Sequence, residues 1–205
     1  TGQKKEEKTN VAPCMDVPFS SVCDQLTVAM HNVTYRTDIL QKNNIHLDNC
    51  FYTDAEYLLY PIPYVKTVTV APQTIYMYRV SLSTQSMNIN SLQRNCAMHE
   101  LVLGHLSDAY AAYENSGTSE PKIAAFLRRN IARIAGMQLF IYLTATDSKA
   151  AKQSAKAMVK TIKGKSETLY TELNGAKSFK MLTSTNFLLF PVLASMKKRE
   201  VGAND

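Results

Sequence analysis

The chain has 205 residues, with seven glycines, seven prolines, no tryptophan and a formal net charge of +6. This length accommodates one domain with a sizeable core, while the sparse glycine argues against turn-rich sandwiches, barrels and glycine-loop nucleotide binders. The moderate positive charge favours acidic partners over nucleic acid, and no apolar run approaches the roughly 18 residues that a membrane span requires.

The chain is expected to divide into one domain and two tails. Residues 1–13 begin with a run of lysine and glutamate, and we expect this tail to be disordered. Residues 14–198 are expected to form a single helical domain, and residues 199–205 a flexible C-terminal tail. A first helix is predicted over about 20–41, because apolar residues recur there at steps of three and four and a serine can cap its start.

A long link without helical period follows this first helix. Residues from about 42 to 83 contain three prolines and six tyrosines. Two β-prone runs within 65–80 either pair as a small hairpin or form an extended crossover. A helix-free stretch of this length is typical of a crossover that spans a helical bundle. Tyr57 and Tyr60 are candidate receptor anchors, or else they seal the link onto the bundle.

Three helices without strong charge patterning are predicted in the second half of the chain. The first of them covers about 90–114, and the next covers about 121–143 with a proline in its first turn. The last three turns of the 121–143 helix are apolar almost all round, so we expect it to be the most buried element. A final helix is predicted over about 179–196, with Pro191 bending it near its end.

A basic amphipathic helix is predicted over 147–165, continuing weakly toward Leu173. Lysines at three- and four-residue steps share one stripe of this helix, namely Lys149, Lys152, Lys156, Lys160 and Lys163. The opposite face is expected to hold the apolar residues Ala151, Ala155, Met158, Val159 and Ile162. The simplest interpretation is a solvated face. The functional interpretation is contact with an acidic receptor or a glycosaminoglycan, and it makes receptor-binding candidates of Lys149, Lys152, Lys156 and Lys160.

Four or five long helices with one long early link favour an all-α four-helix bundle, with the basic helix as an extra element before the last one. Cys23 opens the first predicted helix, Cys50 follows that helix, a Leu-Arg-Arg-Asn-Ile run occupies 127–131, and Phe179-Lys180 begins the last helix. This layout resembles the long-chain four-helix cytokines, within them the leukaemia inhibitory factor and oncostatin M group. The resemblance implies an up-up-down-down bundle in which Phe179 and Lys180 contact a receptor. From the residues alone, Phe179 is favoured as a core residue.

Two features favour secretion. An even number of cysteines lies in the first half of the chain without zinc-ligand spacing, so we expect two disulfides among Cys14, Cys23, Cys50 and Cys96. Three pairings are open, and in an up-up path Cys96 could reach either Cys14 or Cys23. Asn32 begins an N-glycosylation sequon, Asn-Val-Thr. We therefore expect a secreted, extracellular glycoprotein.

The sequence carries no catalytic signature. His99 and His105 share a stretch that superficially resembles a zincin helix, but histidines six residues apart point to different faces and cannot share a zinc ion. Glycine patterns of nucleophile elbows, P-loops and dinucleotide sites are absent. Asp108, Glu114 and Glu120 have the spacing of ordinary solvated charges. We therefore predict no enzyme activity, no catalytic residue, no cofactor and no metal site.

The function predicted from these features is that of a secreted cytokine-like ligand. It would bind cell-surface receptor ectodomains, with a glycosaminoglycan as a further partner, and signal by bringing receptor chains together without inserting into the membrane. One alternative is a secreted carrier that encloses a lipid or small apolar ligand near Met137, Phe140 and Phe187. The other alternative is a pathogen or gamete surface protein that recognises a partner surface.

Overall fold

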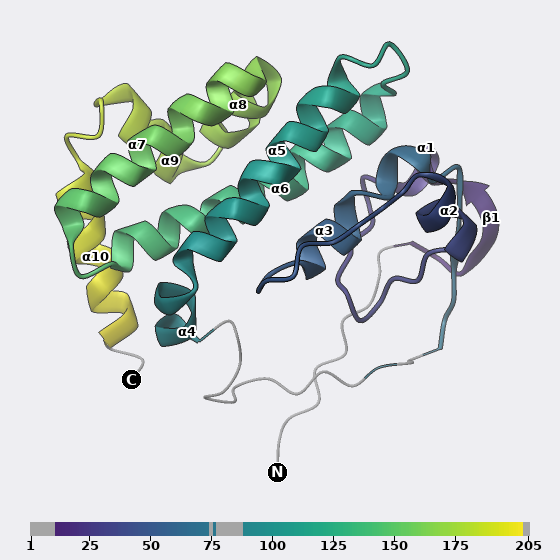
Figure 1. Ribbon diagram of the computed structural model, residues 1–205, viewed down its shortest axis with the longest axis horizontal. Coiled ribbons are helices and arrows are strands. Elements are labelled where there is room, and N and C mark those ends of the chain that lie inside the picture. Colours follow the sequence, from purple (N-terminus) through teal and green to yellow (C-terminus); the bar gives the residue numbers. More distant parts are fainter. Residues whose placement is uncertain (1–10, 74–75, 77–87, 203–205) are drawn as a thin grey trace.

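The computed structural model describes residues 11–73, 76 and 88–202 of the chain. This part is mostly helical, with one small sheet, which confirms the all-α prediction (Figure 1). None of its helices is both long enough and apolar enough to cross a membrane. Most of the predicted N-terminal tail and the last three residues of the C-terminal tail lie outside the described residues.

The N-terminal part joins a two-stranded sheet to several short helices. Strand β1 (Cys14–Pro18) pairs antiparallel with β2 (Thr67–Val70), and Val17 faces Val68. Between the strands the chain forms four short elements, α1 (Phe19–Val22), α2 (Thr37–Lys42), α3 (Asp54–Leu59) and the 3-10 helix η1 (Ile62–Tyr64). The 65–80 region therefore contributes a strand that pairs with a segment about 50 residues earlier. Its second β-prone run lies mostly outside the described residues.

The prediction of a long first helix over 20–41 is wrong. Helix α1 ends at Val22 and α2 begins only at Thr37. Between them the side chain of Asn32 closes a turn, since its Oδ1 accepts the Ala29 N–H at 2.7 Å and its Nδ2 donates to the Thr27 carbonyl at 3.3 Å. Such local side-chain bonds compete with the helical ladder and stop it from forming.

The C-terminal part is a set of packed helices. They are α4 (Ile89–Arg94), α5 (Cys96–Glu114), α6 (Pro121–Thr144), α7 (Ser148–Lys165), α8 (Glu167–Asn174), α9 (Lys177–Ser184) and α10 (Phe190–Gly202). Helices α5 and α6 form an antiparallel hairpin, and α6 also contacts α7, α8 and α10 (Figure 1). The helix predicted over 121–143 is thus present as α6, and it contacts most of the other helices in this set. The basic helix is confirmed as α7, and the 90–114 helix is confirmed with a break at Asn95.

The predicted last helix is divided into α9 and α10, and the expected C-terminal tail is helical as far as Gly202. Asn186 and Phe187 adopt left-handed backbone angles, with φ of 47° and 63°. The Phe187 N–H donates to the Leu182 carbonyl at 2.6 Å and so closes the end of α9. Pro191 then falls in the first turn of α10, where its missing N–H costs no helical hydrogen bond.

Helices α6 to α10 share one hydrophobic core. The predicted apolar residues of α7 are all buried, namely Ala151, Ala155, Met158, Val159 and Ile162. The ring of Phe179 is 2% exposed and belongs to the same core as Phe187 and Phe190. Met137 and Phe140 lie in the last turns of α6, the part expected to be most buried, yet they are only half-buried. The side of α6 that carries these two residues is therefore partly exposed to solvent.

A polar network fastens the end of α5 to α6 and α8. The Glu114 carboxylate accepts hydrogen bonds from the hydroxyls of Ser166 at 2.6 Å, Tyr110 at 3.1 Å and Thr168, and Arg128 donates to the Tyr110 hydroxyl at 3.0 Å. Burial opposes ionisation of Glu114, but these hydrogen bonds and the charge of Arg128 hold the pKa of its carboxyl below the ordinary 4.5. Glu114 is therefore a structural anchor, contrary to its prediction as a solvated charge.

We expect Glu114→Gln to lower the free energy of unfolding at neutral pH by about 1–2 kcal/mol, the usual worth of charge-assisted bonds on a half-buried group. Because the folded pKa is depressed, this contribution is complete above the ordinary carboxyl pKa and is lost as pH falls below about 4.5. Urea unfolding at pH 7 and near pH 3.5 should show the gap between wild type and variant closing in acid. An equal gap at both pH values would contradict the assignment.

Candidate functional site

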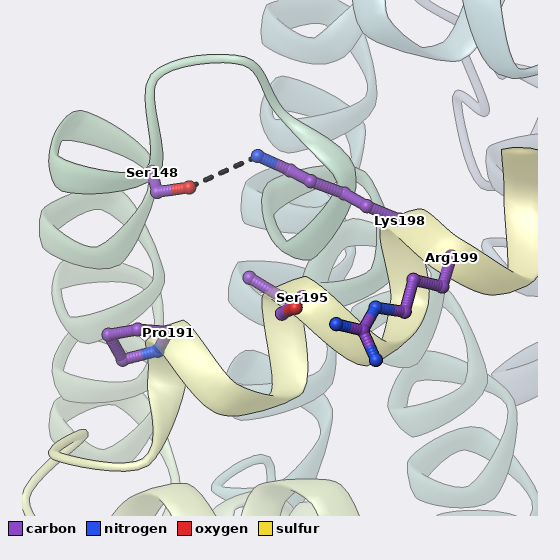
Figure 2. A pocket seen from close by; sticks show the side chains of 6 residues that line it. Ser148, Pro191, Ser195, Lys198 and Arg199 are labelled. Carbon is purple, nitrogen blue, oxygen red and sulfur yellow. Dashed lines mark hydrogen bonds between the residues drawn. The ribbon is translucent and has the colours of Figure 1, made fainter.

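A basic groove lies between α7 and α10. The start of α7 meets α10 where Lys198 donates to the Ser148 hydroxyl at 3.1 Å, and further along α7 the Lys156 ammonium lies 5.9 Å from the ring centroid of Phe187, which precedes α10. A pocket of about 410 Å³ opens at the first of these contacts and is lined by Ser148, Pro191, Ala194, Ser195, Lys198 and Arg199. Figure 2 shows Lys198 reaching across to Ser148 while Arg199 folds back toward Ser195.

The lysine stripe of α7 continues along the helix from Ser148, next to the pocket, whose lining includes none of these lysines. At 100° per residue, the centre of the lysine stripe is about 120° from the centre of the buried face, so the lysines flank that face. Lys152 and Lys156 are accordingly half-buried, whereas Lys149 is exposed. The prediction that the lysines lie opposite the apolar face is wrong. The outermost positions are held by Gln153, Lys160 and Ala157, which are all exposed.

The lysines of α7 differ in their partners. Lys163 lies 4.7 Å from the Tyr170 ring centroid, and Lys165 pairs with Asp108 at 2.7 Å. Lys149, Lys152 and Lys160 form no salt bridge with any residue in the described part of the chain. Their charge is therefore uncompensated locally and available to an acidic partner.

An apolar strip borders the groove on α10. Leu188, Val192 and Met196 follow one another at four-residue steps and are 75%, 55% and 54% exposed. The same segment buries Phe187, Phe190 and Ala194. Both sets have helical spacing, so the sequence alone does not tell which set faces the core, and the exposed strip was not predicted. Three neighbouring exposed apolar side chains beside cationic ones are typical of a protein-contact surface.

The other predicted receptor-binding residues lie away from the groove. Phe179 is buried in the core, so it cannot serve as a receptor anchor in this structure, whereas Lys180 beside it is exposed. Tyr57 is half-buried against Tyr35, with ring centroids 5.4 Å apart. Tyr60 donates to the Glu56 carboxylate at 3.0 Å. Figure 1 shows α3, which carries Tyr57, across the α5–α6 hairpin from α7.

The cysteines do not pair, so the prediction of two disulfides is wrong for this structure. All four thiols are free. The Cys23 thiol donates to the Lys122 carbonyl near the start of α6, whereas Cys96 accepts from Gln138 near its end. Those two positions are about 24 Å apart along α6 at 1.5 Å per residue. The expected pairing of Cys23 with Cys96 assumed helix starts at the same end, and that geometry is absent here.

The predicted glycosylation site is in a tight turn. Asn32 is exposed, and its Nδ2, the atom that would carry a glycan, donates to the Thr27 carbonyl. Because Nδ2 has two hydrogens, one remains for substitution. Glycosylation stays a prediction.

One cluster of metal-ligating side chains was not predicted. His99 is buried and pairs with Gln138 at 2.7 Å, and burial lowers the pKa of its imidazole, so it is a neutral core residue. His105 instead meets Asp48 and Glu56 on the other side of α5, with ligand atoms within 4.8 Å of one another. The two histidines are on different faces, as expected. The carboxylates that contact His105 come from the early link, the segment of about 42–83.

The chain was compared with known proteins, and the comparisons connect it to no established family. No family model matches the chain, and no curated protein or solved structure is significantly similar to it.

Proposed function

We propose that this chain is a non-enzymatic binding protein that docks its basic groove on an acidic surface of a partner protein. The observation that supports this most is the adjacency of two features on α7 and α10. Three lysines without local counter-charges lie on one flank of α7, and an exposed apolar strip lies on the neighbouring helix. Charge alone would suit any anion, but the combination suits an amphipathic protein surface.

The apolar strip and the lysines would contribute differently to binding. Burying the exposed parts of Leu188, Val192 and Met196 would stabilise a complex by roughly 25 cal/mol per Å² of apolar surface removed from water. The cationic flank, with Lys198 and Arg199, would accelerate encounter and set the orientation of the partner. An acidic helix with an apolar face would match both, in the manner of helix-in-groove recognition.

The partner proposed is a cell-surface receptor ectodomain, in keeping with the resemblance to helical cytokines. That proposal does not depend on an up-up-down-down path, because α5, α6 and α7 run in alternating directions and no long first helix is present among the described residues (Figure 1). Receptor contact would run through the groove and not through α9, since Phe179 is buried and no residue of α9 lines the pocket. Secretion and the joining of two receptor chains belong to the same proposal.

A carrier function has less support. It calls for an enclosed cavity near Met137, Phe140 and Phe187. A pocket at the α7–α10 groove and another between α8 and α9 both open to solvent, and neither is lined by any of these three side chains.

The experiment is a binding screen of the purified full chain against receptor ectodomains by biolayer interferometry, repeated at low and high salt. The proposal expects at least one protein partner whose binding weakens as salt rises. Binding to heparin but to no ectodomain would instead indicate that the chain is a glycosaminoglycan-binding protein. A co-purifying lipid and no protein partner would favour the carrier.

A further inference from the structure

The structure brings one histidine and two carboxylates together from three separate segments. Asp48 lies in the loop after α2, Glu56 in α3 and His105 in the middle of α5. His105 Nδ1 is 2.7 Å from Asp48 Oδ2 and 3.7 Å from Glu56 Oε1. We propose that these three side chains bind a divalent transition-metal ion of the Zn²⁺ type.

The distances between the donor atoms fit tetrahedral coordination. With metal–ligand bonds of about 2.0–2.1 Å, neighbouring ligands in a tetrahedral zinc site are about 3.3 Å apart. The two distances from His105 Nδ1, 2.7 Å and 3.7 Å, lie on either side of that value. Shifts of about half an ångström would bring both distances to that value, and all three ligand atoms lie within 4.8 Å of one another. The proton that Nδ1 now shares with Asp48 would leave on binding.

The burial of Glu56 is the second reason for a cation here. Its side chain is 0% exposed, and an ionised carboxylate in such a place needs a positive partner. Among the described residues, only His105 lies within ion-pair distance of the Glu56 carboxylate, at 3.7 Å. A divalent ion would satisfy both carboxylates at once.

Outer groups already orient the Glu56 carboxylate. Its Oε2 accepts the Asp48 N–H at 2.9 Å, and its Oε1 accepts the Tyr60 hydroxyl at 3.0 Å. Burial, and then the bond to Glu56, raises the pKa of Tyr60, so this hydroxyl keeps its proton and stays a donor. Fixed outer-shell donors of this kind are typical of metal-binding carboxylates.

The donor set and its exposure indicate which ion would bind and how it would reach the site. One imidazole and two carboxylates suit Zn²⁺, Co²⁺ or Mn²⁺, whereas Ca²⁺ prefers six to eight oxygens. The side chains of Asp48 and His105 are 34% and 42% exposed, which gives an ion access from solvent and leaves room for a water ligand. The bound ion would clamp the early link and α3 onto α5.

The test is zinc binding by the chelator-treated full chain, measured by calorimetry and by thermal unfolding at several Zn²⁺ concentrations. We expect one equivalent to bind and the melting temperature to rise with Zn²⁺. His105→Gln and Asp48→Asn should each weaken binding at least tenfold, in the range seen when metal-site groups are altered. Both residues are partly exposed, so their variants should fold, and circular dichroism of the metal-free proteins checks this.

Matched controls separate this site from other donors. His46→Gln removes an exposed histidine of the same link, whose Nε2 contacts Asn44, and Cys50→Ser removes the nearest thiol of the link. Both should bind Zn²⁺ like wild type, and Co²⁺ should give tetrahedral visible absorption without a thiolate charge-transfer band. No saturable binding, equal binding by His105→Gln, or a thiolate band lost in Cys50→Ser would each overturn the proposal.

Discussion

Phe179→Ala is expected to lower the free energy of unfolding by about 3–5 kcal/mol, the usual cost of removing a large aromatic side chain from a core. The ring is 2% exposed and is among the largest fully buried side chains of the described residues. It packs in the core that α9 shares with α8 and α10, so its removal leaves a cavity that the neighbouring helices can fill only in part. Urea unfolding followed by circular dichroism measures the loss.

The neighbouring residue provides the matched control for Phe179. Lys180 is exposed, and Lys180→Ala should change stability by less than about 0.5 kcal/mol, as surface substitutions usually do. A Phe179→Ala variant with wild-type stability and impaired partner binding would instead place Phe179 in a receptor contact. That result would restore the role implied by the cytokine resemblance.

Reversing two charges on the groove is expected to slow association with a protein partner by about 10- to 100-fold at low salt. The change is Lys149→Glu with Lys152→Glu, two lysines without local counter-charges in the described residues. Steering by surface charge acts on the association rate, so the dissociation rate should change much less. The difference should shrink as salt shortens the Debye length.

A second double variant tests whether position matters rather than net charge. Lys177→Glu with Lys180→Glu makes the same change in charge on α9, where both side chains are exposed away from the groove. It should retain most of the wild-type association rate. If the two double variants slow association equally, only net charge matters. If neither slows it, the lysine stripe is a solvated face.

The helices of the second half could be predicted because their signals are local. The lysine and apolar stripes of α7 follow the helical period, and Asp147 caps the helix by accepting the N–H groups of Lys149 and Ala150, each at 3.0 Å. Pro121 marks the start of α6 by a different local signal, because a proline is tolerated in the first turn of a helix but not further inside it. A cap and a period suffice to define a helix when nothing in the intervening residues competes.

The N-terminal half could not be predicted because its structure depends on distant or competing bonds. Residues 20–41 have a helical apolar period, yet the turn around Asn32 interrupts it. Strand β1 forms through pairing with β2, which lies about 50 residues later, and no short window of sequence contains that information. The resemblance to cytokines rested partly on this half, because it took Cys23 as the opening of a long helix that does not form.

The two candidate sites were predictable to different degrees. The lysines of the groove share one helix, so their common flank follows from spacing, whereas the strip formed by Leu188, Val192 and Met196 depends on how α10 docks. Asp48 and Glu56 are far in sequence from His105. Histidine spacing within α5 excluded a zincin site but could not indicate ligands contributed by another segment.

The central claim is that the groove between α7 and α10 is the protein-binding surface, and hydrogen exchange of a partner complex tests it most directly. Amide exchange of the free chain and of the complex would be compared by mass spectrometry. Binding through the groove predicts slowed exchange over most of α7, about 148–160, and in the segment 188–199, with little change in α3 or α5. Slowed exchange confined to α3 and α5, with α7 and α10 unchanged, would contradict it.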